Sequence, residues 1–383
     1  MEFVINKSVL VRELQTITGV VEKRATLPIL ANLLLETTEE GLQVGASDLE
    51  VTVRGVAEAT VVKEGSVTLP AGKLHEIARS LPDAEVQFKL LDRNQVQISC
   101  ERTRYRISGQ PRDEFPNFPE LDVSKGIELP GQLLNRMIER VAFAITTEDP
   151  RYSLNGALFL LEKGKLTLVA TDGHRLAYIS KELENKPKDD LDVIVPRKAL
   201  GEVSKLTGDL GPDDIVIFGK SDNQVFFVVG RHRLTCNLLE GKFPRYENVM
   251  PEASETSLVL RREDLANAVR RVSLLASDRY GKAIKLQAGP GKLELSSQTE
   301  MGEAQEELSV EFEGDEIQIG FNARNLLDFL SAVGTDLVRL ELNPTKEGEE
   351  AQPRSEAGDK PGQLRPEPEG DMEYRYVVMP MHL

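Results

Sequence analysis

The chain of 383 residues lacks several features that would assign it to common classes of protein. It has no run of about eighteen apolar residues, and charges interrupt its first residues where a signal peptide needs an apolar stretch. Its two cysteines, Cys100 and Cys236, alternate in step with apolar neighbours, which predicts buried free thiols and no disulfide. We therefore expect a cytoplasmic protein that does not enter the membrane.

Motifs of nucleotide-binding and metal-dependent enzymes are also missing. The chain has no GxxxxGK[ST] loop, no GxGxxG after a strand, no CxxC and no HExxH. Among its four histidines, His174 stands two residues after Asp172 and could imitate an acid–base pair. The stronger interpretation of Asp172 is an Asp-Gly turn, and no nucleophile motif accompanies the pair. We therefore expect no metal, no cofactor and no catalysis.

Acidic residues outnumber basic ones: the chain has 47 Lys and Arg and 63 Asp and Glu, and its net charge is −16. That balance by itself argues against a nucleic-acid-binding protein. The distribution argues the other way, because the predicted helices carry sixteen basic and eight acidic residues, whereas the rest of the chain totals −24. The imbalance suits helices that face a polyanion. The helices are predicted at 7–24, 73–80, 131–145, 197–207, 261–276 and 322–333.

One pattern of helices and strands occurs three times. Apolar residues at helical spacing start near positions 10, 134 and 265, and a second amphipathic segment follows each start. Between them lie alternating, β-branched segments, in which NQV recurs 129 residues later and Phe-Pro recurs 128 residues later. The sequence therefore predicts an α+β protein of three pseudo-repeat domains, at 1–124, 125–251 and 252–383.

The segment 344–371 departs from this pattern. It has eight acidic and four basic residues, five Pro, four Gly and Leu364 as its single large aliphatic residue. Such a composition buries too little apolar surface to offset the entropy of ordering. We predict a disordered acidic insertion between the last helix–strand unit and the final strand, EYRYVV.

The stretch LTLVATDGHRLAYIS, residues 166–180, predicts a strand, a tight turn and a second strand. Asp172 and Gly173 suit the turn, because Gly tolerates positive φ and Asp can accept from nearby backbone N–H groups. The tip of this hairpin is an active site or a docking surface. A second basic tip, Arg231–Arg233, could bind phosphate, but a solvated hairpin flank is the favoured interpretation.

Several long motifs in this order resemble one family, the β subunits of bacterial DNA polymerase III, or sliding clamps. The resemblance covers nearly all of the chain outside 344–371, and its motifs are LPILANLLLE, RYSLNGALF, VATDGHRLA, VIVPRKAL, GKFPRYENVMP, IGFNARNLLDFL and YVVMPMHL. It implies the DNA clamp (processivity) fold, with N-terminal, central and C-terminal clamp domains. It also implies a head-to-tail homodimeric ring of six domains, with helices inside and sheets outside.

The function implied by the resemblance is tethering of the replicative polymerase to duplex DNA, which the ring encircles without reading its sequence. The implied partners are DNA, a second copy of the chain, the DNA polymerase III α subunit, the clamp loader and other proteins with a clamp-binding peptide. Helix spacing agrees, because twelve helices about 8–10 Å apart enclose a bore of roughly 20–28 Å, wide enough for a duplex.

In the family, partner proteins insert a linear peptide into an apolar pocket between the second and third domains. Two methionines at the matching positions are flexible and suit a groove that serves several partners. His382 stands where the family often has Arg. The matching pocket positions are Leu154, Thr171, Gly173, His174, Arg175, Leu176, Pro244, Val249, Tyr280, Asn322, Val377, Val378, Met379, Pro380 and Met381.

Two other sets of positions follow from the resemblance. For DNA it implies Arg24, Tyr152 and Lys198. For the dimer interface it pairs the first domain with the third, through Arg102, Tyr105, Leu274, Leu275 and Glu306. From the residues themselves, a protein–protein adaptor that does not encircle DNA and an enzyme using Asp172 and His174 remain alternatives.

Overall fold

The computed structural model describes residues 1–383 except 23–26, 147–151, 186, 188–189, 252–253, 255, 278–281, 343–359 and 382–383. The chain forms two compact units. The first contains Met1–Arg136 and Val195–Leu238, and the second contains Met137–Ile194 and Leu239–Leu383. Each unit therefore combines one terminal repeat with part of the central repeat.

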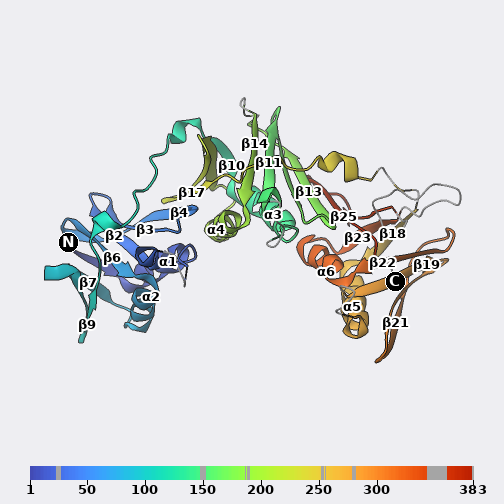
Figure 1. Ribbon diagram of the computed structural model, residues 1–383, viewed down its shortest axis with the longest axis horizontal. Coiled ribbons are helices and arrows are strands. Elements are labelled where there is room, and N and C mark those ends of the chain that lie inside the picture. Colours follow the sequence, from blue (N-terminus) through green and yellow to red (C-terminus); the bar gives the residue numbers. More distant parts are fainter. Residues whose placement is uncertain are drawn as a thin grey trace. The chain divides into compact units, whose positions relative to one another are not determined.

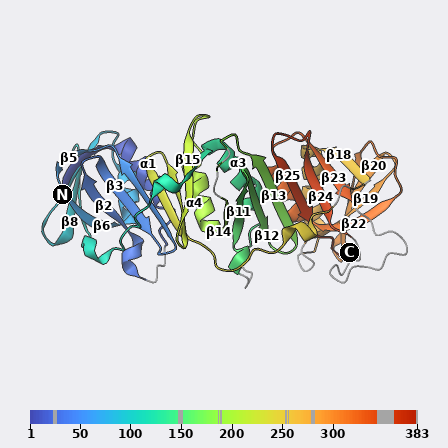
Figure 2. The same cartoon turned by 90° about the horizontal axis from the view of Figure 1, so that it is seen from above.

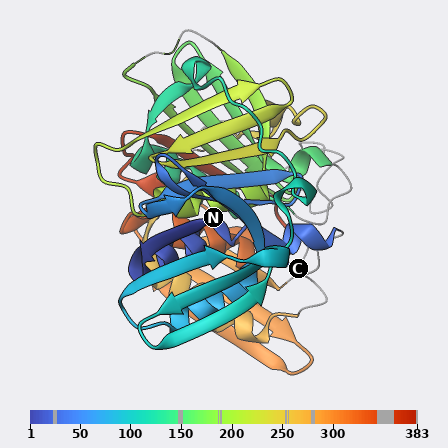
Figure 3. The same cartoon turned by 90° about the vertical axis from the view of Figure 1, so that its left-hand side faces the viewer.

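The first unit has two antiparallel sheets. The five-stranded sheet, whose last three strands are drawn in cyan in Figure 3, has the order β5-β1-β7-β8-β9. Its strands are Thr60–Lys63, Glu2–Asn6, Glu85–Leu90, Gln95–Cys100 and Thr103–Ser108. The eight-stranded sheet has the order β10-β15-β16-β17-β4-β3-β2-β6. Its strands are Ile127–Pro130, Ile215–Ser221, Gln224–Val229, His232–Asn237, Val51–Ala57, Gly41–Ser47, Asn32–Thr38 and Gly65–Pro70.

Three helices cover these sheets, and α1 and α2 lie side by side in Figure 1. Asn6 begins α1 by accepting a hydrogen bond from the Ser8 backbone N–H, while Pro70 and Pro196 precede α2 and α4, where a missing N–H costs little. Leu10, Leu14 and other apolar residues at helical spacing are buried. The helices are α1 (Lys7–Ile17), α2 (Ala71–Ser80) and α4 (Arg197–Thr207).

The second unit repeats this plan with an eight-stranded and a four-stranded sheet. The larger has the order β14-β11-β12-β13-β25-β24-β23-β18, and Figure 2 shows β13 beside β25. Its strands are Leu191–Pro196, Gly156–Glu162, Lys165–Thr171, Arg175–Glu182, Glu373–Val378, Gly362–Glu367, Leu337–Leu342 and Thr256–Arg261. The smaller, β21-β20-β19-β22, is built from Gly302–Ser309, Lys292–Thr299, Ala283–Gly289 and Ile317–Asn322.

Helices α5 and α6 pack together in this unit, and α3 begins in the first unit and ends in the second. Tyr376 of β25 stacks on Phe329 of α6, with ring centroids 5.1 Å apart, and the Tyr374 hydroxyl donates to the Arg140 carbonyl. The core therefore lies between helices and sheet. The helices are α3 (Gly131–Ala142), α5 (Arg262–Val272) and α6 (Ala323–Ala332).

The short 3₁₀ segments lie in the loops and after α5. They are η1 (Pro28–Ala31), η2 (Asp92–Asn94), η3 (Arg112–Glu114), η4 (Val123–Lys125), η5 (Tyr152–Leu154), η6 (Tyr246–Val249) and η7 (Ser273–Leu275).

The element order shows the three-fold pattern, but helices α1 and α3 are shorter than predicted. Helix α1 ends at Ile17 and α3 ends at Ala142, where 7–24 and 131–145 had been predicted. Apolar residues continue beyond each end and are buried as loop residues, so burial alone did not mark the ends. Both cysteines are buried free thiols, as predicted, and burial raises the pKa of Cys236 to about 12.

The prediction of disorder throughout 344–371 is wrong for its last part, where β24 spans Gly362–Glu367. Leu364 is fully buried, and the Gln363 amide donates to Glu341. Pairing with β23 and β25 supplies the burial that composition alone did not reveal. The repeat does indicate a strand at this position, because β8 and β16 each stand immediately before the last strand of their own repeats.

Candidate partner-binding pocket

The pocket predicted from the sequence centres on the tip of the β12–β13 hairpin, which has the expected turn. The Asp172 carboxylate accepts hydrogen bonds from the backbone N–H groups of His174 and Arg175, at 2.9 and 3.0 Å. The Thr171 hydroxyl accepts from the Gly173 N–H, at 3.1 Å. Gly173 has φ +89°, which an L side chain rarely adopts, so Gly permits this turn.

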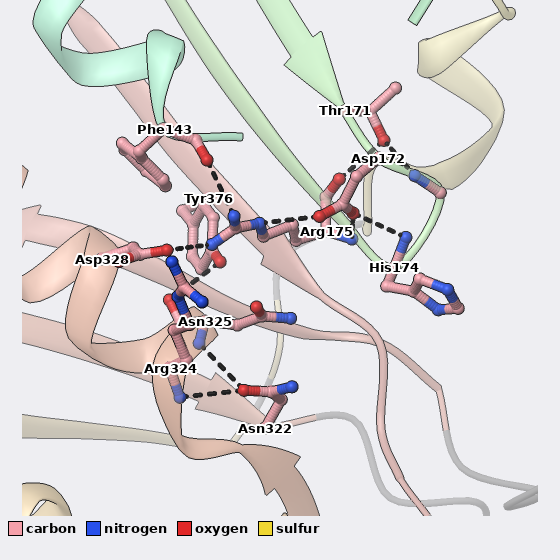
Figure 4. Close-up of polar contacts among 11 residues, drawn as sticks. Phe143, Thr171, Asp172, His174, Arg175, Asn322, Arg324, Asn325, Asp328 and Tyr376 are labelled. Carbon is pink, nitrogen blue, oxygen red and sulfur yellow. Dashed lines mark hydrogen bonds and ion pairs between the residues drawn. The ribbon is translucent and has the colours of Figure 1, made fainter. Parts of the chain in front are cut away.

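Arg175 ties this tip to two other elements of the second unit (Figure 4). Its guanidinium donates to Asp172 at 2.9 Å, to Asp328 of α6 at 2.5 Å and to the Phe143 carbonyl at 2.7 Å. Burial alone would lower the pKa of Arg175, but Tyr376, Asp328 and Asp172 raise it above its usual value. Arg175 therefore stays protonated, and its hydrogen bonds to Asp172, Asp328 and the Phe143 carbonyl, here called the Arg175 cluster, hold the tip in place.

The C-terminal strand forms the neighbouring wall. β25 pairs with β13 so that Val377 is opposite Leu176, and the Met379 N–H donates to the His174 carbonyl at 2.9 Å. Farther on, the Met381 N–H donates to the Gly320 carbonyl of β22, at 2.8 Å. The backbone thus positions the half-buried Met379, Pro380 and Met381 between the hairpin tip and β22.

Asn322 has a structural role that the sequence did not reveal. Its side chain caps α6 and accepts from the backbone N–H groups of Arg324 and Asn325, at 2.9 and 3.3 Å. The Tyr376 hydroxyl donates to the Asn325 carbonyl at 2.9 Å. Asn322 thereby fixes the start of the helix that carries Asp328 beside the tip.

An apolar cluster lies on the sheet face opposite the helices. The predicted residues Leu176 and Val377 belong to it, and the connector after β17 packs against it through Phe243 and Tyr246. Alternation along the strands points Val377 away from the helix-facing Tyr376. The buried members of this apolar cluster are Leu158, Val169, Leu176, Tyr178, Ile194 and Val377.

The remaining predicted positions lie in η5, on the connector after β17 or outside the described residues. Leu154 is buried in η5, whereas Pro244 and Val249 are exposed on the connector. Tyr280 and His382 lie outside the described residues. The structure thus brings Thr171, Gly173, His174, Arg175 and Leu176 together with Val377, Val378 and Met379.

The tip does not have the geometry of an acid–base pair. Asp172 accepts from two backbone N–H groups and from Arg175, while the imidazole of the exposed His174 points away from it (Figure 4). The enzyme alternative therefore loses its only candidate pair. In the described part of the chain, no three His, Cys, Asp or Glu side chains are grouped to hold a metal ion. Nor does any helix of that part have the length and apolarity to cross a membrane.

Of the positions implied for DNA, Lys198 alone has a described side chain, because Arg24 and the Tyr152 side chain lie outside the described residues. Lys198 forms ion pairs with Glu22, at 3.0 Å, and with Asp48. Burial would lower the pKa of Lys198, but Asp48 and Glu22 raise it. The two carboxylates compensate its charge in this chain.

The positions implied for the dimer interface lie on two edge strands. β9, with Tyr105, ends the five-stranded sheet of the first unit, and Arg102 immediately precedes it. β21, with Glu306, ends the four-stranded sheet of the second unit, near η7 and its Leu274 and Leu275. Leu274 is 80% exposed. Arg271 donates to Glu306 at 2.8 Å and holds the pKa of that carboxyl below its usual value.

The sequence did not single out Phe143, Asp328 or Tyr376, although each contacts or supports the tip. Asp328 occurs six residues after Asn322 in NARNLLD, and this spacing places it on the second turn of a helix capped by Asn322. Nothing in the sequence indicated that this turn faces Arg175, 153 residues away along the chain.

Comparison with protein families identifies all three repeats. Residues 1–119, 128–245 and 247–382 match the N-terminal, central and C-terminal domains of the DNA polymerase III beta subunit. The "Beta sliding clamp" of Pseudomonas putida is 36% identical over 386 residues, with both chains fully covered. That of Vibrio cholerae is 35% identical over 350 residues, which cover 90% of this chain and 93% of the relative.

Solved structures agree over the full length. The DNA polymerase III subunit beta of Pseudomonas aeruginosa has a TM-score of 0.88 at 34% identity, with both chains fully covered. The DNA polymerase sliding clamp of Bacillus subtilis has a TM-score of 0.90 at 26% identity and covers this chain completely, with 99% of its own length covered.

Proposed function

Because the chain belongs to the family of DNA polymerase III β subunits, the sliding clamps, we propose that it encircles duplex DNA and tethers the replicative polymerase. It acts as a non-catalytic processivity factor in the bacterial cytoplasm. The observation that carries this proposal is the match of three clamp domains, in order, over the full length. We place the domain boundaries near 124 and 251, where the repeats of the sequence meet.

A closed ring needs two chains joined head to tail. Among the described residues, the edge strands β9 and β21 each pair on one side only, so their outer backbone groups are available to another strand. Leu274 adds an exposed apolar side chain next to β21. We infer that β9 of one copy pairs with β21 of the other, and that Arg102, Tyr105, Leu274, Leu275 and Glu306 line this interface.

Partner proteins dock on the surface formed by the hairpin tip and the C-terminal strand. Its combination of a fixed backbone and adaptable Met379 and Met381 suits a linear apolar peptide that several partners carry. Such a peptide would come from the DNA polymerase III α subunit, the clamp loader or other clamp-binding proteins. Arg24 and Tyr152 would contact DNA through its phosphates, without sequence readout, and Lys198 would join them by exchanging its ion pairs with Glu22 and Asp48 for a phosphate.

The test uses loading onto nicked circular DNA followed by gel filtration at moderate salt. We expect the wild-type chain to stay on the circle and to be lost when the circle is cut once, because a topological link ends at a free end. A Leu274→Glu variant, which places a charge in the interface, should sediment as a monomer and show no retention on either form. Equal retention of the wild type on circular and linear DNA would support an adaptor that does not encircle DNA.

A further inference from the structure

The eight-stranded sheet of the first unit has a basic cavity whose lining contains none of the residues assigned above to DNA, the dimer interface or the peptide pocket. The cavity has a volume of about 290 Å³. It is lined by parts of β3, β4, β16 and β17 and by the turns beside them. Its lining includes Glu40, Arg54, Arg231 and Arg233. We call this cavity the arginine cavity.

Two of its arginines are held opposite each other by strand register. Arg54 of β4 is the cross-strand partner of Arg233 of β17. Like charges that face each other directly across two strands destabilise a sheet. A negative charge placed beside the two guanidinium groups would relieve this repulsion, so the pair points to an anion site.

The surroundings of Arg54 hold its guanidinium in place. It lies over the Phe118 ring at 6.0 Å from the centroid, and Gly45 leaves room for that ring, because a Cβ there would meet Phe118 Cζ at 2.1 Å. Burial and then Arg233 lower the pKa of Arg54, with Glu120 opposing them in part. An arginine kept half-buried beside a second arginine is preorganised for an anion.

The cavity's own carboxylate does not neutralise these arginines. Arg231 donates to the Glu40 backbone carbonyl at 3.0 Å, not to its carboxylate. Within the described ranges, no carboxylate lies at ion-pair distance from Arg54, Arg231 or Arg233. These three guanidinium groups therefore keep N–H donors for a ligand.

We propose that the arginine cavity binds a side-chain carboxylate from an acidic segment of a partner protein. Its volume of about 290 Å³ is just below the roughly 300–1,000 Å³ of pockets for drug-sized ligands, which favours a small group such as one side chain. The planar guanidinium fork matches a carboxylate with two parallel hydrogen bonds. Glu40 in the lining disfavours a dianionic phosphate more than a singly charged carboxylate. The cavity lies in the first unit, so this docking is separate from the apolar pocket of the second.

The test is a calorimetric titration of the full-length chain at about 0.15 M ionic strength, where the Debye length is about 8 Å, with a blocked peptide of consecutive glutamates. The same peptide with glutamines, and inorganic phosphate, are titrated in parallel. We expect the glutamate peptide alone to bind, and Arg233→Gln to weaken binding about tenfold or more through loss of a charged hydrogen-bonding group. Arg233→Lys keeps the charge but loses the planar guanidinium, so its affinity for the glutamate peptide should lie between those of the wild type and Arg233→Gln.

Lys220→Gln is the matched control, because it removes one positive charge from the same sheet outside the cavity lining. It should bind within about twofold of the wild type, since screened surface charges act weakly at a distance. Equal weakening by Lys220→Gln and Arg233→Gln would show binding to overall charge and overturn the site. Binding of phosphate in place of the glutamate peptide, or of neither, would overturn the carboxylate assignment.

Discussion

The two eight-stranded sheets differ in the chemistry of their surfaces although they share one plan. In each, a connector carries an aromatic ring across the face that points away from the helices. Phe118 lies 6.0 Å from the Arg54 guanidinium in the first unit, whereas Tyr246 lies 5.9 Å from the Tyr178 ring in the second. One surface is therefore basic and the other apolar. The repeat supplies the place for a site, and a few side chains decide what binds there.

The tip of the β3–β4 hairpin in the first unit, residues 48–50, shares its turn with the tip of the β12–β13 hairpin in the second. Asp48 accepts from the backbone N–H groups of Glu50 and Val51, as Asp172 does from those of His174 and Arg175. Each Asp also binds a cation, Lys198 in the first unit and Arg175 in the second. The second tip adds Asp328, and it has Gly173 where the first has the exposed Leu49 at φ +76°. The shared turn is thus more rigidly tied in the second unit.

The largest change in stability should come from exchanging the basic and aromatic residues of the two sheets. Tyr178→Arg would place a charge in the apolar cluster beside Arg375, its cross-strand neighbour, and should lower the stability of the second unit by about 3 kcal/mol or more. Hydrogen exchange of the β12 and β13 amides would measure the loss. Tyr178→Phe, which keeps the aromatic ring and loses a 3.4 Å hydrogen bond to Glu373, should change the stability little.

The reciprocal change, Arg54→Tyr, should leave stability nearly unchanged because Phe118 can pack on a tyrosine ring, and it should weaken glutamate-peptide binding. If Tyr178→Arg lowered the stability as little as Arg54→Tyr, burial would not explain the difference between the two surfaces.

The second effect concerns the apolar pocket. Met381→Glu should weaken binding of a polymerase-derived peptide about hundredfold, roughly 2.7 kcal/mol, because a carboxylate would stand where an apolar side chain docks. Fluorescence anisotropy with a labelled peptide would measure it. Arg233→Gln should leave this affinity unchanged, and a loss in both variants would mean that the two sites are not independent.

A smaller difference in stability should appear between variants that remove an ion pair at one tip or the other. Asp328→Ala removes an acceptor from Arg175, whose side chain is only 11% exposed, and should cost about 1–3 kcal/mol. Glu22→Ala removes a carboxylate that is 54% exposed from Lys198 and should cost under about 1 kcal/mol. Exchange rates at the two tips would report both values. Equal costs would contradict the tighter attachment of the second tip.

The smallest effect should come from the turn residues. Gly173→Leu should destabilise the second tip by about 1 kcal/mol, because a side chain at positive φ meets the backbone. Leu49→Gly should be nearly neutral, since relief at φ +76° is offset by the greater freedom of Gly in the unfolded chain. Thermal unfolding would compare them, and marked stabilisation by Leu49→Gly would show that the first tip is strained.

Much of the molecule followed from the sequence because the relevant signals are local and repeated. Helical spacing predicted which faces of the helices are buried, and alternation with Asp172-Gly173 predicted the β12–β13 hairpin. Family motifs then connected the tip with the C-terminal strand. The same reasoning failed for β24, because a polar, proline-rich strand becomes stable only when β23 and β25 supply its hydrogen bonds on both sides.

The sequence by itself determined three copies of an α+β pattern, basic helices and a hairpin tip with a turn. Only the tertiary structure decided that the central repeat is shared between two units, that Asp328 meets Arg175, and that Arg54 stands opposite Arg233. The physical reason is that periodicity records which side of an element is buried. Contacts between residues more than a hundred positions apart depend on strand order and register, which no local pattern encodes.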